Sequence, residues 1–379
     1  MEDIKMRNYN IALLPGDGVG PEVIAQAKRV LDVVQDVING YELDFQEYYV
    51  GNKRFLELGE VIPESTYEDC KKADAILMGA IGMPHGGMKP VTDKNGTEVT
   101  GHLMFKIRFG LGLYAGVRPI KSYPNCKSAL CGTNRKIDLV IFRESVEGLF
   151  ASYGGGGVVR DLCAYDTQII TREGTEKAAK YCFEMALDRP GRVADGKKLV
   201  TCTHKGNVFR SFAFMKKVFY EVAEQYKGRV EADDKMIDAL TLLMTQNPEQ
   251  FDIILAENAH GDIISDLAAS YIGGMGMAPS GDIGDDHAMF QPSHGTAPTI
   301  AGMNIVNPTA TILSGKMMLE WLGKRYNDVA LKKGAELIDK AVYNTFEKGI
   351  RTGDVGGNAS TSVFGDTVVN EIYKLGKEL

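Results

Sequence analysis

Three aspartates stand where their carboxylates could bind a metal ion. Asp262 and Asp266 are four residues apart, so a helix that begins near Gly261 would present both on one face. Like charges at this spacing repel each other by about 0.2–0.5 kcal/mol, which predicts a compensating partner. Asp238 lies in a second helical segment, and three carboxylates that meet in space suit Mg²⁺ or Mn²⁺. The alternative is that Asp262 caps the helix and Asp266 is solvated.

Three arginines form a second group of candidate residues. Arg108 and Arg118 flank the segment 111–115, and Arg143 stands at the end of an apolar run. A guanidinium is a planar fork of donors that matches a carboxylate, so three together would bind a di- or tricarboxylate. The alternative is that they are three ordinary surface arginines.

A lysine and a loop complete the candidates. Lys205 comes just after the predicted buried strand 199–203. It would serve as a base or an electrostatic stabiliser if its pKa were lowered, and a solvated lysine is the alternative. The loop 294–298, together with Asn307, has the small residues and exposed backbone that suit a nucleotide. The glycine turn at 16–20 does not have the spacing of a dinucleotide-binding fingerprint.

The elements that must position these residues alternate between strand and helix. Pro21 opens a helical pattern, Pro308 opens another, and residues 328–348 predict a third. This alternation favours a parallel α/β sheet covered by helices on both faces. The run Gly154 to Gly157 predicts a flexible arm or a hairpin tip. Apolar runs predict strands at 10–14, 73–78, 137–142, 199–203 and 251–256.

The composition excludes several classes of protein. The chain has 379 residues, 44% apolar and 25% charged, which fits one or two globular domains rather than disorder or a coiled coil. A net charge of −7 argues against a polycation that coats nucleic acid. No signal peptide or membrane span is predicted. Six scattered cysteines without a CxxC pair predict reduced thiols and a cytoplasmic location.

In their order along the chain, these segments resemble the isocitrate and isopropylmalate dehydrogenase family, the metal-dependent β-decarboxylating dehydrogenases. The resemblance covers essentially the whole chain. The motifs that carry it are LLPGDGVGPEV at Leu13, LGLYAGVRP at Leu111, FRESVEGLF at Phe142, GDIISDLA at Gly261, HGTAPTIAG at His294 and DVGGNAST at Asp354.

The resemblance implies a two-domain α/β fold with a central mixed sheet and helices on both faces. Residues 1–113 and 273–379 would form the cofactor-binding domain. Residues 114–272 would form a second domain for dimerisation, metal and substrate, with a dimer-forming arm near 151–172. The partners implied are a second copy of the chain and a small 2-hydroxy dicarboxylate, with no role for nucleic acid or a membrane.

The resemblance also implies catalytic and metal-binding roles. Asp262 and Asp266 would bind Mg²⁺ or Mn²⁺ together with Asp238 of the partner subunit. Lys205, which also reaches across the dimer, would act at the C2 hydroxyl of the substrate. The reaction would oxidise the 2-hydroxy acid and then release CO₂.

Substrate and cofactor binding follow from the same resemblance. Arg108, Arg118 and Arg143 would bind the malate moiety. Thr299 and Ile300 offer no cation for a 2′-phosphate, where NADP-preferring relatives tend to have Lys then Tyr, so NAD is predicted. The residues assigned to the cofactor are His294, Gly295, Thr296, Ala297, Pro298, Thr299, Asn307 and Asp354.

Two positions depart from the family pattern. Phe150 replaces a Tyr whose hydroxyl is thought to protonate C3 after decarboxylation, and a phenyl ring cannot donate a proton. His260 stands where a large apolar residue is usual. We hypothesise that His260 or a water molecule replaces the missing hydroxyl; Tyr153 is another candidate, and a packed neutral His260 is the alternative reading.

The segment before Arg108 bears on the choice of substrate. Residues 101–107 lack the Glu of isopropylmalate enzymes and the Ser and Asn that isocitrate enzymes use. The sequence KIR at 106–108 is similar to the KFR of the tartrate and D-malate branch, which predicts a (2R)-malate-type substrate with a small or apolar C3 substituent. 3-Isopropylmalate and isocitrate remain alternatives. Because Phe150 replaces the usual Tyr, a catalytically impaired regulatory paralogue is an alternative function.

Overall fold

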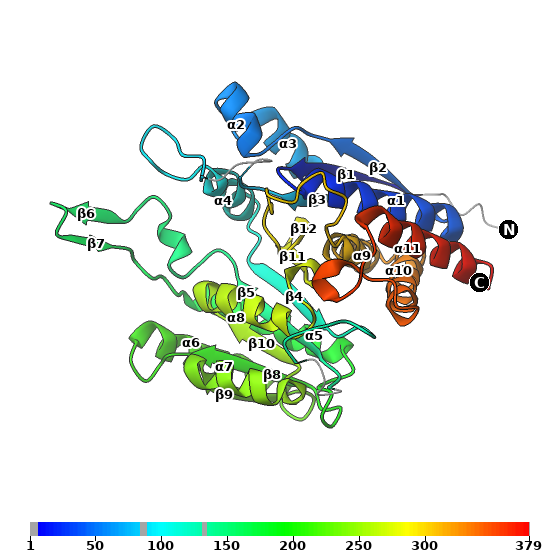
Figure 1. Cartoon of the computed structure of the whole chain (residues 1–379). Coiled ribbons are helices and arrows are strands. Elements are labelled where there is room, and N and C mark those ends of the chain that lie inside the picture. Colours follow the sequence, from blue (N-terminus) through cyan, green and yellow to red (C-terminus); the bar gives the residue numbers. More distant parts are fainter. Residues whose placement is uncertain (1–6, 84–88, 131–134, 379) are drawn as a thin grey trace.

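The fold is built on one ten-stranded sheet with helices on both faces and an arm that projects from its side (Figure 1). The computed structural model describes residues 7–83, 89–130 and 135–378. The strand order is β2-β1-β3-β12-β11-β4-β5-β10-β8-β9. Five neighbouring strands come from the two ends of the chain: β1 (Arg7–Gly16), β2 (Tyr41–Glu47), β3 (Ala75–Ala80), β11 (Pro279–Ile283) and β12 (Ala288–Pro292). The other five come from its middle: β4 (Ala115–Lys121), β5 (Asp138–Glu144), β8 (Leu199–His204), β9 (Glu231–Met236) and β10 (Ile253–Ala256).

The sheet is parallel at both ends and antiparallel at its centre. β11 pairs antiparallel with β12 and with β4, and β4 pairs antiparallel with β5. All other neighbours in this sheet are parallel. A short turn at 284–287 joins β11 to β12, and so short a connection can join only antiparallel strands. The wholly parallel sheet predicted from the alternation is therefore wrong, and the mixed sheet implied by the resemblance is confirmed.

Alternate side chains of β1 face two different helical layers. Ile11 and Leu13 pack in one core cluster, with the layer formed by α1 (Gly20–Ile38), α9 (Thr309–Arg325), α10 (Val329–Glu347) and α11 (Thr361–Gly376). Ala12 and Leu14 pack in another, with α2 (Asn52–Leu58), α3 (Glu64–Lys72) and α4 (Thr100–Gly110). This period of two is expected for a strand buried on both faces.

Four helices cover the strands from the middle of the chain. They are α5 (Arg172–Asp188), α6 (Arg210–Ala223), α7 (Ile237–Gln246) and α8 (Asn258–Ser270). α5 and α6 pack together, with the rings of Phe183 and Phe219 stacked at 5.5 Å, and α7 packs with α8. Right-handed crossovers between parallel strands place the two pairs on opposite faces of the sheet. Short 3₁₀ segments lie at Phe150–Ser152, Glu224–Tyr226, Pro248–Gln250, Met275–Met277 and Gly353–Val355.

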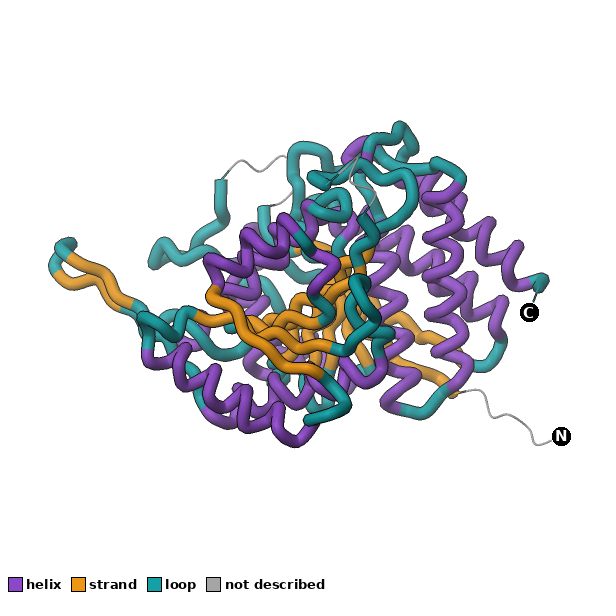
Figure 2. Tube along the Cα trace, turned by 90° about the horizontal axis from the view of Figure 1, so that it is seen from below, coloured by secondary structure: helices purple, strands orange, loops and turns teal. Residues whose placement is uncertain are grey.

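The arm is a two-stranded hairpin that stands away from the body of the fold (Figure 2). β6 (Gly157–Val159) pairs with β7 (Cys163–Tyr165), and the turn between them has positive φ at Arg160 and Asp161. The tip is therefore at 160–162, and the glycine run leads into it. Val158, Leu162 and Tyr165 are exposed by 69%, 81% and 58%. Apolar side chains gathered on a projecting hairpin indicate an interaction surface.

The other predicted elements are present. Each of the five predicted strands corresponds to an observed one, and α1 has Pro21 in its first turn. α9 begins at Thr309, and α10 begins after Asp328, whose carboxylate accepts a hydrogen bond from the N–H of Ala330 at 2.8 Å. The N-terminal signals in the sequence are therefore confirmed.

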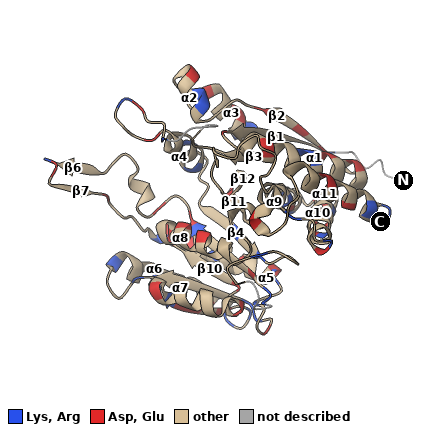
Figure 3. Ribbon diagram, viewed as in Figure 1, with Lys and Arg blue, Asp and Glu red and all other residues tan. Residues whose placement is uncertain are grey.

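The chemistry of the surface and the thiols agrees with the composition. Basic and acidic residues are interspersed over both halves of the fold (Figure 3). Within the described ranges the cysteines are free thiols, at Cys70, Cys126, Cys163, Cys182 and Cys202; Cys131 lies outside those ranges. No helix in the described part of the chain is both long and apolar enough to cross a membrane.

A buried ion pair at the end of the sheet is expected to contribute strongly to stability. Arg189 donates to Asp252 at 2.6 Å and to Asp138 at 2.9 Å, and Asp252 is fully buried. Asp252→Ala would remove one acid partner of the partly buried guanidinium of Arg189 and leave Asp138 as the other. We expect the free energy of unfolding, measured by urea denaturation, to fall by about 1.5–3 kcal/mol.

The control is an exposed pair on the same side of the fold. Asp188 pairs with Lys324 at 2.7 Å, with both side chains more than half exposed. Asp188→Ala should change the free energy of unfolding by no more than about 1 kcal/mol. Equal effects of the two substitutions would contradict this account.

Candidate functional site

Three arginines are buried at the centre of the sheet. Arg118 lies on β4 and Arg143 on β5, and the antiparallel register pairs Gly116 with Arg143. Because residues two apart on a strand share a face, Arg118 and Arg143 point to the same side. Arg108 reaches the region from the last turn of α4. Their exposures are only 7%, 3% and 7% for Arg118, Arg143 and Arg108, so the interpretation as ordinary surface arginines is wrong.

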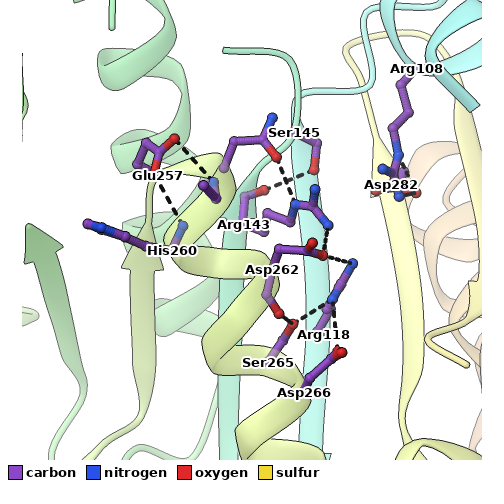
Figure 4. Close-up of polar contacts among 12 residues, drawn as sticks. Arg108, Arg118, Arg143, Ser145, Glu257, His260, Asp262, Ser265, Asp266 and Asp282 are labelled. Carbon is purple, nitrogen blue, oxygen red and sulfur yellow. Dashed lines mark hydrogen bonds and ion pairs between the residues drawn. The ribbon is translucent and has the colours of Figure 1, made fainter. Parts of the chain in front are cut away.

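Each arginine is held along part of its guanidinium by the protein (Figure 4). Arg118 donates from Nη1 to the hydroxyl of Ser265 at 2.5 Å, and its Nε is buried without a partner. Arg143 donates from Nε to the amide oxygen of Asn258 at 2.8 Å and from Nη1 to Asp262. The Nη2 groups of Arg118 and Arg143 are the donors that remain for an anion.

Arg108 is held by a different acid from the other two arginines. Its Nε and Nη2 both donate to one carboxylate oxygen of Asp282, at 3.2 and 3.0 Å. Figure 4 shows this pair set apart from the group around α8. Arg108 lies on α4, and Asp282 lies on β11 among the strands from the chain ends. Arg118 and Arg143 lie on strands from the middle of the chain.

Burial and mutual repulsion destabilise the charged forms of Arg118 and Arg143. Loss of hydration is the largest cause that holds the pKa of Arg118 and of Arg143 below the usual range. Arg108 and the other arginine lower the pKa of Arg143 further, while Asp262 opposes the shift. A guanidinium stays protonated at neutral pH, so the three positive charges persist and attract an anionic ligand.

Helix α8 places two carboxylates beside these arginines. The side chain of Glu257 caps the helix, accepting from the N–H groups of Ala259 and His260 at 3.1 and 3.2 Å. α8 therefore begins at Asn258, before the predicted Gly261, and the alternative in which Asp262 is the cap is wrong. A Cβ at Gly261 would lie 2.8 Å from the Cβ of Arg143, so only glycine allows this close approach.

Asp262 and Asp266 share one face of α8, as predicted, and their charges are compensated. Arg118 lies 3.6 Å from Asp262 and 3.8 Å from Asp266. The two carboxylates are about half exposed, at 46% and 52%. Partial burial and the charge of Asp262 raise the pKa of Asp266, while Arg118 lowers it. A divalent cation at these oxygens would relieve the remaining repulsion, so the donor set fits Mg²⁺ or Mn²⁺.

A cavity of about 310 Å³ joins the arginines to α4 and to the loop after β12. Its charged walls include all three arginines and Asp262. Helix α4 contributes an apolar wall through Met104 and Phe105, completed by Phe150. The other lining residues are Gly79, Ala80, Ile81, Thr100, Gly101, Ser280, Gln291, Pro292, Ser293, His294 and Gly295.

Lys205 and Asp238 meet each other outside this cavity. The Nζ of Lys205, just after β8, lies 3.0 Å from a carboxylate oxygen of Asp238 at the start of α7. The hydrogen bond from Lys205 is the main cause that lowers the pKa of Asp238. Across residues 7–83, 89–130 and 135–378, no three His, Cys, Asp or Glu side chains lie close enough to hold a metal ion. A third ligand from a second copy stays a prediction.

The two departures from the family pattern lie in different environments. Phe150 lines the cavity, with its ring 5.0 Å from the guanidinium of Arg143 and 5.9 Å from the ring of Phe105. His260 stacks on Phe212 at 4.6 Å, and its Nδ1 is buried without a partner. His260 is not among the residues that line the cavity of its own chain, so its catalytic role stays a prediction.

The loop assigned to the cofactor packs against the first glycine turn. The N–H of Val19 donates to the carbonyl of Thr296 at 2.9 Å. Gly18 has φ +57, and a Cβ there would lie 2.1 Å from the same carbonyl oxygen. His294 lines the cavity; burial lowers its pKa, and its Nε2 has no partner. This orphaned atom and the exposed backbone at Gly295 suit a bound nucleotide.

Two further residues assigned to the cofactor are joined behind this loop. The amide of Asn307 donates to Asp354 at 3.0 Å and accepts from the N–H of Thr309 at 3.0 Å. Asp354 also accepts from the hydroxyl of Thr352 at 2.5 Å. Ala297, Pro298 and Thr299 continue the loop, with Ala297 and Thr299 exposed. Asn307 and Asp354 are therefore joined to each other, and Asn307 also holds the first residue of α9.

The site contains four polar residues that the sequence alone did not indicate. Asn258 and Ser265 anchor Arg143 and Arg118, while Asp282 and Gln291 surround Arg108. Ser265 stands between the two aspartates of α8, three residues after the first, so its spacing was a usable signal. Asp282 and Gln291 lie in short strands without a periodic pattern, and nothing in their spacing singles them out.

Comparisons with known proteins agree with this arrangement. The family model for isocitrate/isopropylmalate dehydrogenase matches residues 10–368. The chain is 35% identical to the 3-isopropylmalate/3-methylmalate dehydrogenase of Methanocaldococcus jannaschii, over 96% of this chain and 99% of that one. It is 37% identical to the isocitrate/homoisocitrate dehydrogenase of Thermus thermophilus, over 97% and 99%. The crystal structure of isocitrate dehydrogenase from Methylococcus capsulatus superimposes with a TM-score of 0.80 at 31% identity, covering 96% and 99%.

The partly buried His260 should make stability depend on pH. Burial is the main cause that lowers its pKa, although Glu257 opposes the shift. Below the unfolded value of about 6.5, the unfolded chain takes up a proton that the folded chain does not, so stability is lost as pH falls. In His260→Phe the ring can still stack on Phe212 but no longer titrates.

We expect the fall in Tm between about pH 8 and pH 5.5 to be smaller in His260→Phe than in the natural chain. Differential scanning calorimetry of both proteins in matched buffers measures this difference. The same fall in both would show that His260 does not contribute to the loss of stability in acid.

Proposed function

The chain belongs to the isocitrate/isopropylmalate dehydrogenase family, and from this premise we propose that it oxidises and decarboxylates a (2R)-malate-type 2-hydroxy acid with NAD and Mg²⁺ or Mn²⁺. The observation that carries the proposal is the cavity that joins the buried Arg118 and Arg143 to Asp262. An anion site beside a carboxylate pair is the arrangement that a dicarboxylate and a divalent cation require together.

The arginines would bind the carboxylates of the substrate through their free donors. Arg143 and Arg118 each keep Nη2 without a hydrogen bond to the protein. Because Asn258 and Ser265 fix the other donors, the free ones are oriented before the substrate arrives. Specificity for a malate skeleton would follow from this fixed spacing.

The metal and NAD would supply the redox chemistry. When bound, NAD accepts the hydride from C2 and the metal withdraws electron density from the C2 oxygen. Asp262 and Asp266 would hold the metal, with Asp238 of the partner subunit as the third carboxylate. Metal binding at Asp262 would also release Arg118 and Arg143 from their present acidic partner, which leaves them free for the substrate.

Lys205 of the partner subunit would act on the C2 hydroxyl. Its present pairing with Asp238 places both side chains at the end of β8 and the start of α7. The pair would therefore approach the cavity of the other copy together. There the amine of Lys205 would exchange a proton with the C2 hydroxyl, while Asp238 would serve as a ligand of the metal.

Phe150 requires a different proton donor at C3. Its ring packs between Arg143 and Phe105 and offers no proton. Of the substitutes considered, we favour a water molecule. His260 stacks on Phe212 and Tyr153 packs on Phe105 at 4.3 Å, and neither lines the cavity of its own chain. The reaction then ends with protonation of C3 by water held in the cleft.

The wall of the cavity favours an apolar substituent at C3 of the substrate. Met104, Phe105 and Phe150 form this wall. Lys106 is turned away, because it pairs with Glu64 at 2.6 Å. Lys106, the cation of the segment that is similar to the tartrate and D-malate branch, is therefore not available to the substrate. We propose a 3-alkylmalate ahead of D-malate and tartrate. A third carboxylate, as in isocitrate, would have to be desolvated against this wall.

The arm supports a homodimer. Its exposed apolar side chains, Val158, Leu162 and Tyr165, have no cover within one chain. The division into domains 1–113 with 273–379 and 114–272 is supported by the separation of the ten strands into two groups of five. Both the dimer and the cofactor preference for NAD, which rests on the uncharged Thr299, remain part of the proposal.

A regulatory paralogue without activity is the second candidate. Phe150 favours it, because the usual tyrosine is absent. Lys205 and the three acids Asp238, Asp262 and Asp266 oppose it, because a chain that has lost catalysis has no need of them.

A panel of substrates tests the proposal. The purified chain is mixed with NAD and Mn²⁺, and NADH absorbance is followed with D-malate, 3-methylmalate, 3-isopropylmalate, tartrate, isocitrate and homoisocitrate. We expect kcat/KM for a 3-alkylmalate to exceed that for isocitrate by at least about tenfold, because the third carboxylate of isocitrate would have to be desolvated against the apolar wall.

A matched pair of lysine variants controls the panel. Lys205→Met should abolish turnover, whereas Lys227→Met, an exposed lysine in the turn after α6, should retain it. No turnover of any substrate by the natural chain would overturn the dehydrogenase proposal and favour the regulatory one. Faster turnover of isocitrate than of the alkylmalates would overturn only the substrate assignment.

A further inference from the structure

A buried carboxylate that the proposed reaction does not use contacts one of the substrate-binding arginines. Asp282 is 1% exposed, and one of its oxygens accepts three hydrogen bonds. Two come from Arg108, at 3.2 and 3.0 Å, and the third comes from the side-chain amide of Gln291 at 2.8 Å. Such a carboxylate inside a protein requires a compensating charge, which Arg108 supplies.

This contact determines which edge of the Arg108 guanidinium is free. The Nε and Nη2 edge is occupied by Asp282. Because the five donors of a guanidinium lie in one plane with fixed directions, the remaining donors on Nη1 and Nη2 must point away from Asp282. Arg108 lines the cavity, so these donors are the ones that a ligand can reach.

Gln291 fixes Asp282 in turn. It lies on β12, which pairs with β11, and it is itself 8% exposed. Its amide N–H donates to the same oxygen that binds Arg108. The three side chains therefore form one chain of hydrogen bonds across two strands and the end of α4, with Gln291 at the cavity wall.

The counter-charge of Arg108 also differs from that of the other two arginines. Arg118 and Arg143 share Asp262, which is 46% exposed and is assigned above to the metal. Asp282 is buried on the other group of strands, away from α8, and contributes no part of its side chain to the proposed metal site. Arg108 alone would keep its acid partner while the substrate is bound.

We propose that Asp282, supported by Gln291, is a positioning residue that turns the free edge of Arg108 toward the substrate carboxylate, across the cleft from Arg118 and Arg143. This inference rests on the proposed function for the identity of the ligand. It adds one requirement to substrate binding by the arginines: Asp282 must stay paired with Arg108 while the substrate binds.

Exchange of acid and amide tests this inference. Asp282→Asn keeps the shape but removes the charge and weakens the hold on Arg108, so KM for the best substrate of the panel should rise by roughly tenfold, with a smaller change in kcat. Gln291→Glu places a second carboxylate beside Asp282 and should also raise KM. In the double variant Asp282→Asn, Gln291→Glu one acid and one amide are restored beside Arg108, and KM should recover most of the loss.

A control and a structural measurement separate this inference from the proposed function. Asp285→Asn, at an exposed acid in the turn after β11, should leave KM and kcat unchanged. Crystal structures of the natural chain and of Asp282→Asn should show the guanidinium of Arg108 in two different orientations. This comparison needs no turnover, so it decides the inference even when the whole panel is inactive and the proposed function fails.

Two results would overturn the inference. One is an unchanged or lowered KM in Asp282→Asn while the natural chain turns over. The other is an Arg108 guanidinium that stays in place without the acid. If Asp282→Asn does not fold, the double variant decides, since a KM raised by tenfold or more in that folded protein would also overturn the inference.

Discussion

Three guanidinium groups held out of water are the constraint on which the rest of the site depends. Removing such a charge from water costs several kcal/mol unless acids and hydrogen-bond acceptors replace the lost hydration. The fold supplies Asp262 to Arg118 and Arg143 and supplies Asp282 to Arg108. A cluster this costly is retained where binding requires it, and the free donors that remain are arranged for an anion.

Several features of the backbone follow from this constraint. The antiparallel register of β4 and β5 places Arg118 and Arg143 on one face. Gly261 lets α8 approach Arg143 closely enough to bring Asp262 within reach. The two groups of strands meet at β11 and β4, so Arg108 and Asp282 reach the cavity from the opposite side. Motion between the two groups would change the spacing of the arginines and thereby the affinity for the substrate.

Much of this arrangement could be predicted from local sequence, because local spacing determines it. The i, i+4 aspartates of α8 fall on one face whatever the tertiary structure, and the apolar runs before Arg143 and Lys205 end where strands end. The helix start at Asn258, capped by Glu257, could not be predicted with the same certainty, because Glu257 and Gly261 both suit the start of a helix.

The rest depends on contacts between distant parts of the chain. Asp282 is 174 residues from Arg108, and Ser265 is 147 residues from Arg118, so no spacing rule connects them. The antiparallel centre of the sheet arises from the β11–β12 hairpin, whose two five-residue strands show no alternating pattern. Lys205 pairs with Asp238 away from the other two aspartates, and no three acids of the described residues converge, so the proposed third metal ligand stays a prediction.

The central claim is that two copies share each active site, and mixed dimers test it most directly. A chain with Arg118→Met is co-expressed with a differently tagged chain carrying Lys205→Met, and the heterodimer is isolated by both tags. Each variant alone should be inactive, but a shared site predicts one intact site per heterodimer and about half of the natural kcat per dimer. A heterodimer as inactive as its parents would contradict the account.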